Sequence, residues 1–202
     1  MKNKILVFLT LIVLFATTSV FAVAFTDLTE EHWAFNYIAD LTEKKVVNGY
    51  PDGTFLPEGT ISRGEFLKLV IAASMPKDVP IALAPKAIEH WAGQYLHVAI
   101  TYGVVSPNDI TLENIDLPIT RREMTAMITK ADLNMRGISK NTEKSLTFTD
   151  FSEFNTYERE LLTHAISQEY LNGYPDGSFG PNNEMTRAEA ATVIYRFTNI
   201  QK

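Results

Sequence analysis

Apolar residues recur at helical spacing in two kinds of segment that alternate along the chain. In the first kind they stand at positions i, i+4, i+5 and i+8, which is typical of an amphipathic helix of about three turns. The three segments of this kind carry Trp33, Tyr37, Ile38, Leu41 and Lys45; Trp91, Tyr95, Leu96 and Ala99; and Tyr157, Leu161, Leu162 and Ala165. We expect each helix to end where Gly or Asn can adopt the left-handed conformation, near Asn48-Gly49, Gly103 and Asn172-Gly173.

Each segment of the second kind begins with Ser or Thr, then Arg, any residue and Glu. This pattern predicts a capping box, in which the hydroxyl and the carboxylate satisfy backbone amides at the start of a helix. Apolar residues at helical spacing follow in every case, so a second helix is expected there. The predicted structural caps are Ser62 with Glu65, Thr120 with Glu123, and Thr186 with Glu189.

These segments belong to a repeated unit. The stretch from Asn48 to Glu65 returns without a gap from Asn172 to Glu189, and a weaker copy lies between them. In the two strong copies Pro-Asp-Gly, at 51–53 and 175–177, predicts a tight turn that Phe55 and Phe179 anchor from below. A lone helix–loop–helix unit could not bury both helix faces. We therefore predict an all-α fold of three units packed together.

The first 24 residues are typical of a secretory signal peptide. Lys2 and Lys4 precede an apolar run from Ile5 to Ala16, and Ala22-Val23-Ala24 supplies the small residues that a signal peptidase requires. The run is too short for a stable membrane span, although a retained anchor is the alternative. We expect a secreted mature chain that begins at Phe25 and has no membrane span.

Composition and motifs argue against several classes of function. The chain has no cysteine, so neither disulfides nor a thiolate metal site are expected. The formal net charge of −6 argues against a nucleic-acid partner. The four histidines are dispersed, and no catalytic fingerprint is present. We expect His32 and His90 to cap or pack, and we predict no enzymatic activity, no metal and no cofactor.

One residue of the capping pattern is not explained by capping. Arg63, Arg121 and Arg187 occupy the first turn of the second helix in all three units, where a cation faces the positive end of the helix dipole. Helix N-terminal amides beside a guanidinium make a receptor for a carboxylate or phosphate. The alternative is an internal ion pair with an acidic residue such as Asp27 or Asp150.

With Phe-x-Asp, His-Trp-Ala, Gly-Tyr-Pro-Asp-Gly-x-Phe and Thr-Arg-Ala-Glu present, the chain resembles the S-layer homology (SLH) domain family. The resemblance implies three tandem modules, at 25–76, 83–134 and 147–202, which form a pseudo-threefold, all-helical spindle. It also implies a non-covalent anchor in the cell wall or S-layer. Grooves between the modules would bind an anionic secondary cell-wall polysaccharide attached to peptidoglycan, often through a pyruvylated sugar.

The resemblance also assigns candidate glycan-binding residues. It gives the groove arginine as Arg63, Arg121 and Arg187, the lead aspartate as Asp27 and Asp150, and the loop glycine as Gly49 and Gly173. The lead aspartate would accept sugar hydroxyls, and the glycine would let a backbone amide approach the sugar. Trp33 and Trp91 have two interpretations, a buried core position and a sugar contact, and the core position is favoured because both begin the apolar stripe.

The middle unit departs from the pattern. It has Leu83-Ala84-Pro85 in place of Phe-x-Asp and Ser106 to Ile110 in place of the Pro-Asp-Gly loop, and the third unit has Tyr157 in place of tryptophan. We therefore expect one or two grooves to bind rather than three. Two other functions stay open: a module that binds S-layer or other envelope proteins through exposed apolar loops, and the targeting part of a glycan-processing system.

Overall fold

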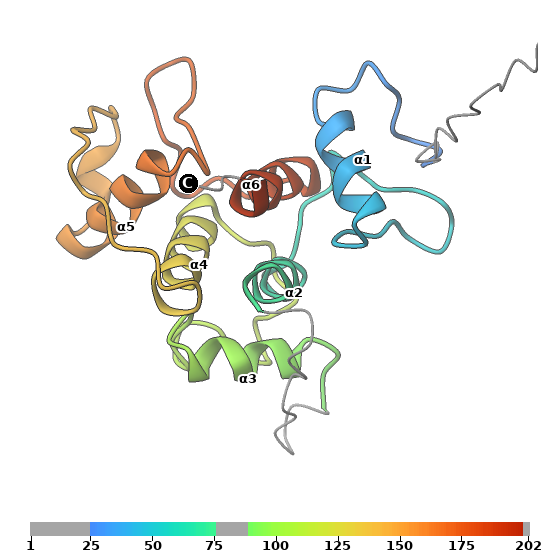
Figure 1. The fold of residues 1–202 in the computed structure, drawn as a ribbon, viewed down its shortest axis with the longest axis horizontal. Helices are drawn as coiled ribbons and strands as arrows, with labels where there is room; N and C mark the ends of the chain where they lie inside the picture. Colours follow the sequence, from blue (N-terminus) through green and yellow to red (C-terminus); the bar gives the residue numbers. More distant parts are fainter. Residues whose placement is uncertain (1–24, 76–88, 200–202) are drawn as a thin grey trace, which may run out of the picture.

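A computed structural model describes residues 25–75 and 89–199 (Figure 1). The predicted signal peptide at 1–24 and the Leu83-Ala84-Pro85 segment lie outside these residues. The described part contains six α-helices, one short 3-10 helix and no strand, which confirms the all-α fold class. The helices are α1 (Phe35–Glu43), α2 (Arg63–Ser74), α3 (Gly93–Thr101), α4 (Arg121–Asn134), α5 (Thr156–Ser167) and α6 (Arg187–Asn199), and the 3-10 helix η2 (Phe151–Glu153) precedes α5. None of the helices described is long and apolar enough to cross a membrane.

The helices of one repeat pack mainly against helices of another repeat. The first helix of each repeat lies on the second helix of a neighbouring one, so that α1 packs on α6, α3 on α2 and α5 on α4. In Figure 1, α2, α4 and α6 lie nearest the centre and α1, α3 and α5 lie outside them. The buried apolar side chains form one continuous cluster that includes residues of all three repeats. A single repeat would leave these helix faces exposed to water.

Three backbone hydrogen bonds join the repeats in a closed cycle just before the second helices. The Ile61 N–H donates to the Met185 carbonyl, the Met185 N–H to the Ile119 carbonyl, and the Ile119 N–H to the Ile61 carbonyl, each at 3.0 Å. All three side chains are buried, with at most 1% of their surface exposed. The cycle fixes the starts of α2, α4 and α6 relative to one another.

The first amides of each second helix donate to a neighbouring repeat. In α2, the Arg63 N–H donates to the Leu117 carbonyl at 3.0 Å and the Gly64 N–H to the Ile115 carbonyl at 2.8 Å. Equivalent bonds join α4 to the loop of the third repeat and α6 to the loop of the first. The expectation that these amides form part of an anion receptor is therefore wrong, because they already have backbone partners.

The capping boxes are formed as predicted. The Ser62 hydroxyl accepts from the Glu65 N–H while the Glu65 carboxylate accepts from the Ser62 N–H, and the pairs Thr120–Glu123 and Thr186–Glu189 do the same. A fourth box, Asn155 with Glu158, starts α5. This box was not predicted from the sequence, because the repeated pattern has a hydroxyl residue followed by an arginine, whereas asparagine is an equally good cap.

The predicted ends of two first helices are wrong. The helix α1 stops at Glu43, and Lys45 takes the left-handed conformation with φ of 58°. Glu169 does the same after α5, with φ of 61°, whereas Gly103 after α3 was correctly predicted and has φ of 66°. Packing of the next residues, including the buried Val47 and Leu171, outweighs the preference for glycine at these stops.

The predicted turns and their aromatic anchors are confirmed. The Gly53 N–H donates to the Tyr50 carbonyl at 3.0 Å and the Gly177 N–H to the Tyr174 carbonyl at 3.1 Å, and both glycines have φ of 84°. Phe55 and Phe179 lie beneath these turns and expose at most 1% of their surface. The loops before α2 and α6 are therefore packed against the core.

A buried polar network joins α4 to α5 and to the loop that follows it. The Asp132 carboxylate, fully buried, accepts from His164 Nε2 at 2.9 Å and from the Tyr170 hydroxyl at 2.8 Å. The Nδ1 atom of His164 accepts from the Asn141 N–H at 3.0 Å, so the proton of the neutral imidazole lies on Nε2. Arg136 Nη1 lies 3.3 Å from the other oxygen of Asp132 and balances its charge.

Replacing Tyr170 with phenylalanine tests this network. Burial, and then the bond to Asp132, raise the pKa of Tyr170 above its usual value. The folded state thus holds this proton to a higher pH than the unfolded chain, and the resulting stability is present below about pH 10 and lost as the pH rises further. Tyr170→Phe should lower the free energy of unfolding by about 1.5–3 kcal/mol at neutral pH.

Urea unfolding between about pH 8 and 11 provides the measurement. The stability of the unmodified protein should fall more steeply above about pH 10 than that of the Tyr170→Phe variant. Parallel pH profiles would show that the hydroxyl does not retain its proton in the folded state as described.

Candidate functional site

The repeated arginine of each second helix crosses to the loop of a neighbouring repeat. Arg187 of α6 lies on the loop of the first repeat, Arg63 of α2 on that of the second, and Arg121 of α4 on that of the third. This direction is the same as that of the amide bonds at the helix starts. The structure thus brings each arginine together with residues 51 to 139 positions away in the sequence.

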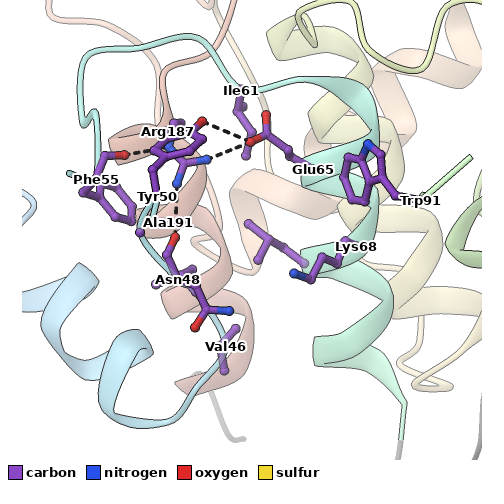
Figure 2. A pocket seen from close by; sticks show the side chains of 13 residues that line it. Val46, Asn48, Tyr50, Phe55, Ile61, Glu65, Lys68, Trp91, Arg187 and Ala191 are labelled. Atoms are coloured by element: carbon purple, nitrogen blue, oxygen red, sulfur yellow. Dashed lines mark hydrogen bonds and ion pairs between the residues drawn. The ribbon is translucent and has the colours of Figure 1, made fainter. Parts of the chain in front are cut away.

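The Arg187 groove is a hollow of about 250 Å³ lined by residues of all three repeats. Arg187 donates through Nε to the Phe55 carbonyl at 2.8 Å, through Nη1 to Glu65 at 2.9 Å and through Nη2 to the Asn48 carbonyl at 3.3 Å. Figure 2 shows its guanidinium beside the Tyr50 ring, whose centroid lies 4.6 Å away. The remaining lining residues are Val46, Val47, Gly49, Ile61, Lys68, Leu69, Trp91 and Ala191.

The Arg121 groove, of about 180 Å³, is the equivalent hollow on the third repeat. The guanidinium of Arg121 lies 4.7 Å from the ring centroids of both Tyr174 and Phe179, and Nη2 donates to the Asn172 carbonyl. Only 8% of the Arg121 side chain is exposed, and this burial lowers the pKa of the guanidinium from its usual value. The other lining residues are Trp33, Tyr170, Leu171, Gly173, Met185, Glu189, Thr192, Val193 and Arg196.

The hollow at the middle repeat is built differently. This Tyr157 groove, of about 500 Å³, is lined by Asp109, Arg122, Glu123, Thr125, Ala126, Lys130, Phe154, Asn155, Tyr157, Glu158 and Leu161. Arg63 is not among these residues. Its Nε and Nη2 atoms bond the Glu123 carboxylate at 2.8 to 3.1 Å. The loop of the middle repeat has Asn108 at the position that Tyr50 and Tyr174 occupy in the other two.

The alternative that the repeated arginines form internal ion pairs is correct for Arg63 and Arg187, but the acidic partners named from the sequence are wrong. Arg63 and Arg187 pair with the cap glutamates Glu123 and Glu65, and neither pairs with Asp27 or Asp150. Each pairing glutamate belongs to the repeat on whose loop the arginine lies. Pairing does not remove Arg187 from its groove, since the guanidinium still lines it.

The interpretation of the tryptophans as core residues is wrong. Trp33 exposes 55% of its surface and Trp91 exposes 51%, because each precedes its helix and projects beyond the core. Trp91 lines the Arg187 groove, and Trp33 lines the Arg121 groove. Tyr157, 53% exposed, takes the corresponding place in the third hollow. Each hollow thus includes an exposed aromatic side chain from a repeat other than the one whose loop forms it.

The histidines that precede these tryptophans hold the turn, as expected for a capping role. His32 Nδ1 accepts from the Ala34 N–H at 3.1 Å, and Nε2 lies 3.0 Å from Glu58. His90 repeats both contacts with Ala92 and Asp116. The imidazole and indole rings of each His-Trp pair lie against one another, with centroids 5.6 to 5.7 Å apart.

The lead aspartates brace the loops from outside the grooves. Asp27 accepts from the Phe55 and Leu56 amides at 2.8 Å, and Asp150 accepts from the Phe179 and Gly180 amides at 2.7 to 3.1 Å. Neither aspartate lines one of the three hollows. Their carboxylates therefore act on the loop that carries the aromatic anchor.

The loop glycines do line grooves, but packing explains why they are glycines. A Cβ atom at Gly49 would lie 2.3 Å from the Phe25 ring and 2.5 Å from the Thr54 carbonyl, and one at Gly173 would lie 2.3 Å from the Phe148 ring. No side chain larger than hydrogen fits at either position. The close approach is to the protein's own aromatic ring.

Several groove residues were not predicted from the sequence. Tyr50 and Tyr174 stand at equivalent positions in the two strong copies of the repeat, and each ring lies beside an arginine. Their identity in both copies was a usable signal of this role. Lys68 and Arg196 add a second cation to the Arg187 and Arg121 grooves, but they occupy different helix positions. No sequence pattern could have linked these two cations, because only the packing of the helices brings each beside an arginine.

Comparison with known proteins supports the resemblance for the outer repeats. The family model described as S-layer homology domain matches residues 24–67 and 147–191. The chain is 27% identical over 176 residues to S-layer protein EA1 of Bacillus anthracis, and 29% identical over 116 residues to the cellulosome-anchoring protein of Acetivibrio thermocellus. It is 28% identical over 177 residues to an endoglucanase of Bacillus sp. strain KSM-635.

These relatives are much longer than the matched region. The matches cover 85%, 54% and 86% of this chain, but only 20%, 26% and 18% of the three relatives in the same order. The similarity therefore concerns a shared domain. It does not transfer the endoglucanase activity to this chain.

Replacing the lead aspartates tests their bracing role. Asp27→Asn and Asp150→Asn should each lower the free energy of unfolding by about 1–2 kcal/mol, because an amide presents one acceptor oxygen where the carboxylate presents two. Glu30→Gln, an exposed change in the same lead segment, is the control. Urea unfolding measures the effect, and unchanged stability in both aspartate variants would contradict the role.

Proposed function

We propose that this protein is a non-covalent anchor of the cell envelope. It binds an anionic, pyruvylated secondary cell-wall polysaccharide attached to peptidoglycan, in the Arg187 and Arg121 grooves. The chain acts outside the cell, at the wall or S-layer, and carries out no catalysis. The matched family and the anchoring and S-layer roles named for two relatives support this proposal.

The observation that carries the proposal is the pairing of a guanidinium with an exposed aromatic face in one hollow. In the Arg187 groove, the cation is Arg187 and the aromatic face is Trp91; in the Arg121 groove they are Arg121 and Trp33. A guanidinium binds a carboxylate through charge-assisted hydrogen bonds. An exposed indole offers a flat apolar surface on which a sugar ring can stack. A pyruvylated sugar presents both complementary groups.

The charges in the grooves favour an anionic ligand. The Arg187 groove contains Arg187 and Lys68 against one carboxylate, Glu65, although the whole chain has a net charge of −6. The Arg121 groove likewise contains two arginines against Glu189. A local excess of positive charge in an acidic protein concentrates the attraction for an anion in these hollows.

Wall binding by arginine variants tests the proposal. Arg187→Ala and Arg121→Ala should each weaken binding to purified wall sacculi by roughly 10- to 100-fold at the altered groove, the loss expected for charge-assisted hydrogen bonds. Arg63→Ala is the matched control, because this residue is equally placed on its helix but lines none of the three hollows described. Sedimentation with sacculi measures binding, and unfolding curves check that each variant is folded.

The same assay separates the two main functions. Chemical removal of the secondary polymer from the sacculi should abolish binding if the polysaccharide is the ligand. Leu56 and Leu117 expose 46% and 54% of their surface on loops, so a protein-binding function has a possible surface. Undiminished binding to an envelope protein after removal of the polymer, with Arg187→Ala and Arg121→Ala equal to the unmodified chain, would contradict the proposal.

A further inference from the structure

The three repeated arginines differ in how completely the protein neutralises them. Arg63 makes three hydrogen bonds of 2.8 to 3.1 Å to the Glu123 carboxylate. Arg187 makes one bond, at 2.9 Å, to Glu65. The Nη1 atom of Arg121 lies 4.0 Å from Glu189, too far for a hydrogen bond. Three equivalent positions in the fold therefore carry cations in three different electrostatic states.

Arg121 also has the least satisfied guanidinium. Within the described residues, its buried Nε atom has no hydrogen-bond partner, whereas Nε of Arg187 donates to the Phe55 carbonyl and Nε of Arg63 to Glu123. Only 8% of the Arg121 side chain is exposed, so water compensates it less than a surface cation. Leaving a buried charged group short of partners is costly, and an anion that approaches it recovers part of that cost.

A second cation lies in the same hollow. Arg196 lines the Arg121 groove and bonds only weakly, through Nη1 to the Tyr170 carbonyl at 3.4 Å. The positive charge of Arg196 disfavours the charged form of Arg121. An anionic ligand between the two side chains would offset this repulsion. The Tyr157 groove is the opposite case, because its cation Arg122 pairs with Glu158 at 3.1 Å and Arg63 does not line it.

We propose that the three hollows are not equivalent and that the Arg121 groove is the primary anion site. The Arg187 groove is secondary, because its ligand must share the guanidinium with Glu65. The Tyr157 groove is the weakest, because its repeated arginine, Arg63, is neutralised by Glu123 and does not line the hollow. This ranking rests on the proposed function, since it orders sites for the same acidic sugar.

The positions of the two tryptophans allow each groove to be observed separately. The chain contains only Trp33 and Trp91, and they line the Arg121 and Arg187 grooves, respectively. Their indole N–H resonances, assigned with Trp33→Phe and Trp91→Phe, report occupancy groove by groove in one titration of the full chain. The probe is a methyl glycoside carrying a pyruvate ketal, and its neutral methyl ester is the matched control.

The ranking predicts that the Trp33 resonance shifts at a roughly tenfold lower probe concentration than the Trp91 resonance, the difference expected for one charge-assisted bond. Equal midpoints, or an earlier shift of Trp91, would overturn the ranking while leaving the proposed function intact. If neither resonance shifts, or if the ester acts as strongly as the acid, the proposed function itself fails.

Removal of the competing carboxylate provides a second test. Glu65→Gln keeps an acceptor oxygen for the cap but removes the charge that neutralises Arg187, so the Trp91 midpoint should fall several-fold toward that of Trp33. Glu189→Gln is the matched change in the Arg121 groove, and it should move the Trp33 midpoint by a smaller factor, because Glu189 is 4.0 Å away. Equal shifts in the two variants would contradict the inference.

Discussion

The cycle of hydrogen bonds among Ile61, Met185 and Ile119 is the constraint on which the rest of the structure depends. It sets the starts of the three second helices around a common centre, and each of those starts then donates its first amides to a neighbouring loop. Buried backbone groups must be paired, so a separated repeat would leave these donors and acceptors unsatisfied as well as its helix faces exposed. Each groove lies where different repeats meet.

This arrangement explains how the guanidinium of Arg187 is held in the same groove as the exposed indole of Trp91. Loop carbonyls hold the guanidinium from one side, as the Phe55 and Asn48 carbonyls of the first repeat do for Arg187. The indole of Trp91 comes from the middle repeat. The side chain is therefore ordered before any ligand binds, which reduces the entropic cost of binding. The same cap glutamates that start the helices also face the repeated arginines, at 2.9 Å for Glu65 and 4.0 Å for Glu189. Under the proposed function, helix capping and ligand affinity would therefore be coupled.

The parts of the fold that depend on local sequence were predictable, and the parts that depend on neighbouring repeats were not. The capping boxes, the Pro-Asp-Gly turns and the buried Phe55 follow from residues close together in the chain. The exposure of Trp33 depends on where α1 meets α6, and the partner of Arg187 lies 122 residues away. The left-handed stop at Lys45 overrode local preference in the same way.

The structure of the protein bound to an acidic fragment of its own wall polysaccharide is the most direct test of this account. We expect a carboxylate of the glycan within hydrogen-bonding distance of the Arg121 guanidinium, with a sugar ring against the face of Trp33. A glycan bound away from both Arg121 and Arg187, or one whose carboxylate faces solvent, would contradict it.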